Sequence, residues 1–413
     1  DSYVELKHLQ STHPIVADIF PPSRTPSRLL WRLFYFISYS KPVTTHHYPR
    51  LLMLLQHLWD MQKYPALREW NMLMRLAADG QRGGGEAILQ RCLGILNDYI
   101  QNARPGTTKG RELDMSSVLD RSSPNQPDIY TYTILIHVAT MTKNPAHVRD
   151  AISLLEKSGL QPTLVTHLTI LNHCARTHDT SGMRDILRKI EASNMQLGVD
   201  GINTCIWAFA LNGELELALA IYRVLRHQVR PDSDPSTVTQ LKERLRREHN
   251  INLADDVKPD HRTYVALIQA MSYHAQFNDA FAVFADFLDT HHRQRLSPTT
   301  GPAFRALFLG FSKFAVGRLE LAVNRNHPHA QWNLANLRKV YRLFLKMPRD
   351  VVPSKSTIYW IMTSFDQAAD HDIEVSREVW QELEERYKPI APSLFNQARL
   401  RRIRAILFPP GPD

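Results

Sequence analysis

Apolar residues recur along most of this 413-residue chain at the spacing of amphipathic α-helices. Within 214–227, Leu217, Ile221 and Val224 lie three or four positions apart and therefore share one helix face. Similar runs alternate with short polar turns. They predict helix pairs at 129–142/146–158, 164–177/181–194 and 199–211/214–227.

The predicted pairs return at a fixed interval, because Ile129, Leu164 and Val199 open successive pairs 35 residues apart. A period of this length is typical of stacked helical hairpins, each of which buries its apolar face against its neighbours. Such a stack offers a groove to an extended partner rather than a closed pocket to a small molecule. The fourth residues of the three first helices, Tyr132, His167 and Ile202, are expected to face the stack.

The same pattern divides the whole chain. The expected parts are an extended segment at 1–26, an N-terminal helical block with a degenerate repeat at 27–103, a linker or insertion at 104–126, three regular repeats at 127–232, an inserted helix at 233–256, further repeats at 257–388 with an insertion at 315–330, and a basic capping helix and tail at 389–413.

Several short motifs resemble one known family. A Thr-Tyr pair opens the helices at 129 and 261, Asn203 is followed by an apolar run, and units end in Gly159-Leu-Gln-Pro162 or Val257-Lys-Pro-Asp260. These residues are similar to the pentatricopeptide repeats of the P type, most fully over 127–290. The resemblance implies an all-α, right-handed superhelical solenoid of helix–turn–helix repeats. It also implies binding of single-stranded RNA in an organelle, in the processing, stabilisation or translation of mitochondrial transcripts, without a small-molecule cofactor.

The resemblance also implies which positions contact RNA, since each repeat of this family reads one base. The fifth residue of the first helix and the last residue of the repeat contact the base edge, and the second residue packs on the base face. The fifth positions are Thr133, Leu168, Asn203 and Val265, the last positions are Thr163, Gly198 and Asp232, with Asp260 as the alternative to Asp232, and the second positions are Tyr130, Val165, Asp200 and Arg262.

Asn203 is the one fifth position with a familiar partner. Paired with Asp232 or Asp260, it resembles the combination that prefers uridine. Leu168 and Val265 cannot hydrogen-bond a base, so a continuous base-by-base code is not expected. Tyr130, Arg262 and Tyr359 are instead expected to stack on bases, which every sequence tolerates.

The charge of the chain favours a polyanionic partner. Lys and Arg number 50 against 41 Asp and Glu, giving a net charge of +9. Two basic clusters are candidates for phosphate contacts, and the alternative for both is a solvated helix face. They are Arg399, Arg401, Arg402 and Arg404 near the C-terminus, and Lys242, Arg244, Arg246 and Arg247 in the inserted helix, where Glu243 and Glu248 interleave and favour the solvated face.

Other chemistry finds little support in the sequence. The three cysteines have no metal-ligand spacing and no HExxH motif occurs, so neither a metal site nor catalysis is expected. No run reaches the ~18 apolar residues of a membrane helix. Without an initiator Met, a removed or untraced segment before Asp1 is expected, and a mitochondrial transit peptide is neither visible nor excluded. The competing hypothesis is a structural or adaptor solenoid that docks on a mitochondrial ribosome or another protein complex.

Overall fold

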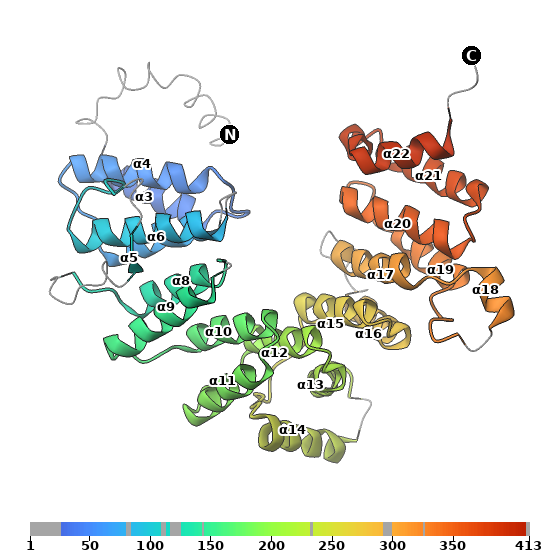
Figure 1. The fold of residues 1–413 in the computed structure, drawn as a ribbon, viewed down its shortest axis with the longest axis horizontal. Coiled ribbons are helices and arrows are strands. Elements are labelled where there is room, and N and C mark those ends of the chain that lie inside the picture. The colour runs from blue at the N-terminus through green and yellow to red at the C-terminus, as the bar shows by residue number, and fades with distance from the viewer. Residues whose placement is uncertain are drawn as a thin grey trace. The chain divides into compact units, whose positions relative to one another are not determined.

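The computed structural model describes residues 26–79, 84–108, 113–115, 125–142, 144–231, 234–291, 300–324 and 327–409. Over these residues the chain is all-α, and an isolated parallel bridge between Leu197 and Leu253 is the one extended pairing. Consecutive helices form hairpins (Figure 1). The all-α fold of helix–turn–helix repeats is therefore confirmed. No described helix has the length and hydropathy needed to span a bilayer.

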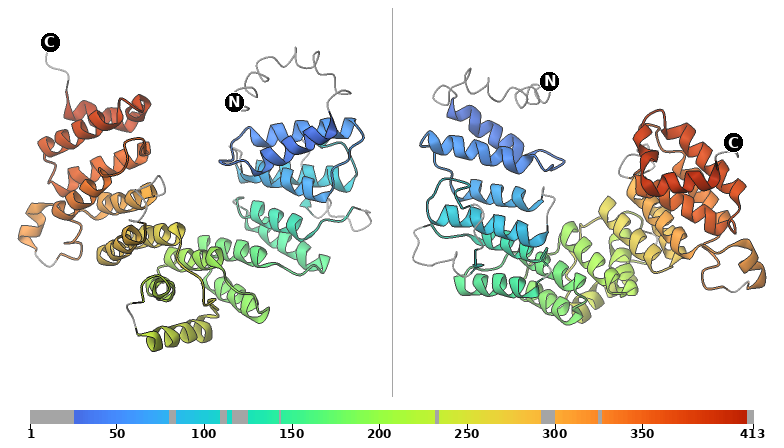
Figure 2. Two further views of the ribbon diagram at one scale, coloured as in Figure 1. Left: turned by 180° about the vertical axis from the view of Figure 1, so that it is seen from behind. Right: turned by 45° about the horizontal axis from the view of Figure 1, so that its top comes forward.

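The chain divides into two compact units, 1–173 and 174–413. The helices of the first unit are layered in chain order, and the views of Figure 2 agree on this layering. They are α3 (Ser27–Tyr39), α4 (His47–Asp60), α5 (Leu67–Asp79), α6 (Gly85–Ile100), α8 (Ile129–Ala139), α9 (Pro145–Ser158) and most of α10 (Leu164–Arg176).

The second unit starts within α10 and holds the remaining helices. They are α11 (Thr180–Ala192), α12 (Val199–Leu211), α13 (Leu215–His227), α14 (Pro235–His249), α15 (His261–Tyr273), α16 (Phe277–His291), α17 (Gly301–Phe314), α18 (Arg318–Val323), α19 (Leu334–Phe344), α20 (Lys355–Ala368), α21 (Ile373–Tyr387), the 3-10 helix η3 (Pro392–Asn396) and α22 (Ala398–Leu407).

Local sequence explains where the helices begin and end. Asp128 and Asp260 accept the backbone N–H of Thr131 and Thr263 at 2.9 Å and so cap α8 and α15. Gly159, with φ of 75°, ends α9 in a left-handed conformation that favours glycine. Tyr132, His167 and Ile202 are buried, as the periodicity predicted.

The segment predicted as a linker or insertion at 104–126 is packed onto α6 wherever it is described. The Asp98 carboxylate accepts the backbone N–H groups of Gly106, Thr107 and Thr108 at 2.7–3.1 Å. Burial raises the pKa of Asp98, and these hydrogen bonds partly offset that rise. Gln90 holds the backbone of Leu113 in the same way, at 2.8 Å. The described residues of 104–126 are thus held to α6 by hydrogen bonds.

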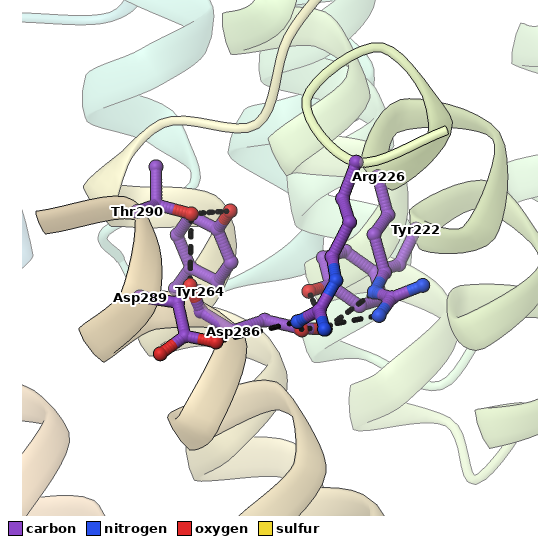
Figure 3. Close-up of polar contacts among 7 residues, drawn as sticks. Tyr222, Arg226, Tyr264, Asp286, Asp289 and Thr290 are labelled. Carbon is purple, nitrogen blue, oxygen red and sulfur yellow. Dashed lines mark hydrogen bonds and ion pairs between the residues drawn. The ribbon is translucent and has the colours of Figure 1, made fainter. Parts of the chain in front are cut away.

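A half-buried ion pair joins two consecutive helix pairs of the second unit (Figure 3). Arg226 of α13 contacts Asp286 of α16 at 2.5 Å, and the Tyr222 hydroxyl donates to the same carboxylate at 2.9 Å. Tyr264 of α15 adds a hydroxyl contact to Thr290 at 3.1 Å. Burial, followed by the neighbouring tyrosine and carboxylate, raises the pKa of Tyr222. The cluster ties the second helices of neighbouring repeats together with satisfied polar groups.

Candidate nucleic-acid interface

Asn203, the fifth residue of α12, lies against the first turn of α15. Its amide Nδ2 donates to the Asp260 carboxylate at 3.0 Å, and its Oδ1 accepts from the Thr263 hydroxyl at 2.6 Å. The carboxylate can only accept, so the amide orientation follows from the network. Of the two aspartates predicted as partners, Asp260 is the one in contact; Asp232 lies outside the described residues.

The carboxylate of Asp260 is held in its charged form. Burial opposes ionisation, but hydrogen bonds from the Thr263 backbone, from Asn203 and from the Thr263 hydroxyl outweigh it, so the pKa of Asp260 lies below its usual value. Asp260 also forms a capping box, since its backbone N–H donates to the Thr263 hydroxyl. One carboxylate therefore both starts a helix and fixes the fifth-position amide of the preceding repeat.

The first unit contains the same cluster, which the sequence reasoning missed. Asn71, the fifth residue of α5, donates to Asp128 at 3.0 Å and accepts from the Thr131 hydroxyl at 2.8 Å. The spacings agree with those of the second unit: 57 positions from Asn to Asp and 60 from Asn to Thr in both clusters. Asn71 is 8% exposed, and Asn203 is half-buried. Asn203 is therefore the more accessible of the two amides.

At the Thr133 position hydroxyls stand in place of the amide and the carboxylate, and Thr166 contacts both of them. Thr133 donates to the Ile129 carbonyl at 2.7 Å and contacts the Thr166 hydroxyl at 2.8 Å. The Thr163 hydroxyl contacts Thr166 at 3.0 Å. The three hydroxyls therefore already have partners within the chain.

The second positions lie on the surface, as expected of groups that meet a base face. Tyr130 and Val165, on α8 and α10, are 68% and 63% exposed. In the second unit the Arg262 guanidinium contacts the Asp200 carboxylate at 3.3 Å, and both side chains are exposed. This ion pair occupies Arg262, so a base that stacks on its guanidinium must share it with Asp200.

The other fifth positions differ in character. Leu168 and Val265 are half-buried. Tyr359 is the fifth residue of α20 and is also half-buried, with the Arg399 guanidinium over its ring at 5.5 Å. Arg305 is the fifth residue of α17 and is exposed; the sequence reasoning gave it no role. An aromatic ring and a cation are both suited to a nucleobase face or a phosphate.

The two predicted basic clusters have different surroundings. On α14 every cation has a carboxylate partner at 3.0 Å or less: Lys242 with Asp255, Arg244 with Glu248, Arg246 with Glu191 and Arg247 with Glu243. On α22, Arg404 reaches Glu384 only at 4.0 Å. Arg401 and Arg402 are exposed and form no ion pair with any described carboxylate. Of the two clusters, the one on α22 is where exposed cations lack a described carboxylate partner.

The described residues contain no grouping of three His, Cys, Asp or Glu side chains that could hold a metal ion. The three cysteines are buried, and burial raises the pKa of each thiol, to about 12 for Cys92 and Cys205 and about 11 for Cys174. These thiols stay protonated at neutral pH and are poor nucleophiles.

Residues 125–176, which hold α8, α9 and α10, match the family model described as a pentatricopeptide repeat domain. Over these residues the chain is similar to a pentatricopeptide repeat domain. Its bounds include Thr133, Thr163 and the exposed Tyr130 and Val165. No curated protein sequence matches the chain.

Solved structures of pentatricopeptide repeat proteins are also similar to this chain. The crystal structure of PPR10 from maize aligns with 14% identity and a TM-score of 0.43, covering 89% of this chain and 48% of that one. PPR10 in complex with an 18-nt psaJ RNA element aligns with 14% identity and a TM-score of 0.48, covering 89% and 49%. The chain thus spans about half the length of these structures.

Proposed function

We propose that this chain binds single-stranded RNA along the exposed first turns of its first helices and favours uridine at Asn203. The observation that supports this most is the fixed amide of Asn203. Asp260 takes one of its two amide hydrogens and Thr263 takes one lone pair of its oxygen. One N–H and one lone pair are left for a ligand.

The remaining N–H suits uracil, whose O4 accepts, whereas the remaining lone pair lies on the far side of the amide and does not meet the same base edge. Adenine carries an amino donor at the corresponding position of its edge, so the fixed N–H discriminates between the two bases. The hydrogen bonds to Asp260 and Thr263 already order the amide before RNA binds, so binding loses less side-chain entropy. Asn71 has the same orientation at a less exposed site, and we assign it the same preference with a smaller effect.

The remaining contacts do not depend on base identity. Tyr130 offers an exposed aromatic face at a second position, Tyr359 a half-buried ring at a fifth position, and Arg262 a guanidinium shared with Asp200. Arg401 and Arg402 are placed to neutralise phosphates. Together they predict a binder with one or two base-selective positions within a sequence-tolerant site.

By family resemblance, the RNA is a mitochondrial transcript bound in the matrix, and occupancy assists its processing, stabilisation or translation. A bound strand is shielded from nucleases and held out of competing base-paired structure, which requires no catalytic group on the protein. The predicted absence of enzymatic activity belongs to the same proposal.

The test measures fluorescence anisotropy with the full chain and two labelled RNAs of equal length, one oligouridine and one oligoadenosine. We expect wild type to prefer oligouridine and Asn203→Ala to lose about five- to tenfold of that preference, the value of one or two hydrogen bonds. Affinity for oligoadenosine should stay within about twofold. Asn396→Ala, on an exposed position of η3, is the matched control.

The adaptor hypothesis predicts the opposite outcome. If wild type binds neither RNA, or if Asn203→Ala weakens both RNAs equally while the thermal midpoint is unchanged, base recognition at Asn203 is wrong. A thermal unfolding scan of each variant separates loss of recognition from loss of fold.

A further inference from the structure

The insertion at 315–330 and the second helix of its repeat border a cavity of about 460 Å³ between α18 and α19. Figures 1 and 2 show these two helices side by side at the edge of the second unit. The cavity volume lies within the range of about 300–1,000 Å³ that is usual for small-molecule sites. Its described lining has a cationic and an aliphatic part and includes no carboxylate and no aromatic ring. The cations are Arg318, Arg338, Lys339 and Arg342, and the aliphatic residues are Val316, Leu321, Leu334 and Ala335.

The chain does not neutralise the four cations of this cavity. None of them forms an ion pair with a described carboxylate, in contrast to the four cations of α14. Helix α19 contains no acidic residue, and the one acidic residue of α18, Glu320, contacts His327 at 3.2 Å. Arg338 and Arg342 lie four positions apart on one face of α19, where like charges repel each other. A bound anion would relieve this repulsion, and the aliphatic walls concentrate the field of the cations inside the cavity.

The first turn of α19 brings backbone donors to the same cavity. Asn333, which also lines the cavity, caps the helix by accepting the N–H of Asn336 at 3.0 Å. The N–H groups of Leu334 and Ala335 have no partner among the described residues. Lys339 leans toward this turn, since its ammonium contacts the Asn336 side chain at 3.2 Å. Free N–H groups at the positive end of a helix favour a negatively charged group.

We propose that this cavity binds a small organic phosphate. The phosphate group pairs with the cations and with the free N–H groups of the α19 first turn, and the carbon part contacts Leu321 and Leu334. A phosphate monoester carries a charge of about −1.5 to −2 and three acceptor oxygens, which suits several cations and backbone donors better than a carboxylate does. The guanidinium groups of Arg338 and Arg342 offer it bidentate hydrogen bonds.

The cavity lies away from the proposed RNA contacts. Helix α18 follows the C-terminal end of α17, about 20 Å along that helix from its first turn. Val316 holds the cavity at this end, because its backbone N–H donates to the Trp332 carbonyl at 2.9 Å. The described lining also lacks an aromatic ring on which a base could stack. Phosphate binding here therefore does not depend on the proposed RNA contact, which uses the first turns of the first helices.

The test is isothermal titration calorimetry of the full chain at one low ionic strength with four ligands. They are hexyl phosphate, inorganic phosphate, heptanoate and hexanol. We expect hexyl phosphate to bind most tightly. Inorganic phosphate should bind about three- to tenfold more weakly because it lacks the carbon part, heptanoate at least fivefold more weakly because it carries a single charge, and hexanol not measurably.

Two variants locate the phosphate group and the carbon part separately. Arg338→Gln/Arg342→Gln should weaken hexyl phosphate and inorganic phosphate alike, at least tenfold. Leu321→Ser should reduce the affinity for hexyl phosphate to that for inorganic phosphate and leave inorganic phosphate unchanged. All three side chains are exposed or half-buried, so the thermal midpoints should be preserved.

Two controls match these variants. Arg244→Gln/Arg247→Gln removes the same number of charges from α14, where both cations are already paired. Val323→Ser removes an aliphatic side chain that is 91% exposed on α18 and does not line the cavity. Both controls should bind hexyl phosphate as wild type does.

The proposal is overturned if hexyl phosphate binds no better than hexanol, heptanoate or inorganic phosphate, or if Arg338→Gln/Arg342→Gln binds it as wild type does. It is equally overturned if the α14 control loses as much affinity, since net charge then explains the binding. If hexyl phosphate does not bind and Arg338→Gln/Arg342→Gln weakens oligouridine, the cavity is a nucleic-acid site instead. Failure of RNA binding in wild type, with hexyl phosphate binding intact, would contradict the proposed function alone.

Discussion

The amide of Asn203 donates to the carboxylate of Asp260 at 3.0 Å, although 57 positions separate the two residues. This contact joins the first helices of two repeats across the α14 insertion. It places the cap of one helix and the fifth-position amide of the preceding repeat in a single hydrogen-bonded unit. Folding of the stack and orientation of the amide therefore depend on the same carboxylate.

The first prediction concerns the charge of that carboxylate. The pKa of Asp260 in the folded chain lies below the unfolded value of about 3.9. Its contribution to stability is then fully present above pH ~4 and lost as the pH falls through the folded pKa. We expect Asp260→Asn to lower the free energy of unfolding by about 0.5–1.5 kcal/mol at pH 7. The difference from wild type should shrink toward pH 3.

Urea unfolding followed by circular dichroism at several pH values measures this effect. Asp255→Asn is the control, because this carboxylate also has a lowered pKa, from its hydrogen bond to Lys242, but is exposed and caps no helix. A constant difference between Asp260→Asn and wild type from pH 7 to pH 3 would show that the charge of Asp260 does not stabilise the fold.

The fifth position of α5 shows why part of the interface escapes sequence reasoning. Regular repeats place the fifth residue and the third residue of the next first helix 33 positions apart, as in Thr133 and Thr166. Asn71 and Thr131 are 60 positions apart, so an insertion of 27 residues hides their relationship from a search for a 35-residue period. The clue was the Asn at the fifth helical position in Leu67–Asp79.

The helices themselves were predictable because burial imposes the 3.6-residue period on them. The burial of Tyr132 and Ile202 follows from that period alone. The partners of surface charges cannot be predicted from that period, since they depend on neighbouring elements. Arg246 reaches Glu191, 55 positions away on α11, and nothing in the local pattern indicates this contact. The exposure of Leu319 on α18 could not be predicted from the local pattern either, because apolar residues usually mark the core.

The second prediction concerns the ion pair of Figure 3. Asp286→Ala removes the partner of Arg226 and of the Tyr222 hydroxyl, and leaves both groups in a largely buried site. We expect a loss of about 2–4 kcal/mol in the free energy of unfolding, below the full cost of a completely buried pair because Arg226 retains some access to water. Guanidinium-chloride unfolding measures the loss.

Asp289→Ala is the matched control for this prediction. Its contact with Arg230 at 3.3 Å is exposed on both sides, so the expected change lies within about 0.5 kcal/mol. Equal losses for the two variants would contradict the view that burial makes the Asp286 contact the important one.

The third prediction sets two opposing effects against each other at Gly310. Replacing a glycine inside a helix by alanine normally stabilises it by about 1 kcal/mol. Here the new Cβ would lie 2.4 Å from the Trp332 ring and 3.0 Å from the Ser272 Cβ. Trp332 is fully buried and donates its indole N–H to the Ala275 carbonyl at 3.0 Å, so it has little room to move.

The clash should therefore outweigh the gain, and Gly310→Ala should lower the free energy of unfolding by about 1–3 kcal/mol. Thermal unfolding of the variant measures this cost. The double variant Gly310→Ala/Trp332→Leu separates the two effects. If steric contact is the cause, removing the ring recovers part of the loss that Gly310→Ala produces; if not, the two losses simply add.

The last prediction uses salt to distinguish free cations from paired ones. Arg401 and Arg402 on α22 are exposed and without a described carboxylate partner, whereas Arg244 and Arg247 on α14 already pair with Glu248 and Glu243. A phosphate contact by a free cation releases a counterion, and each contact contributes about 0.7 to the slope of log affinity against log salt for a single strand. Arg401→Ala/Arg402→Ala should therefore lower the magnitude of that slope by about 1.4 and weaken all RNAs alike. Arg244→Ala/Arg247→Ala removes the same number of charges but frees two carboxylates, so its slope should stay near that of wild type. Anisotropy titrations with oligouridine over a series of salt concentrations measure the slopes of the two double variants. Identical slopes would exclude α22 as the phosphate contact.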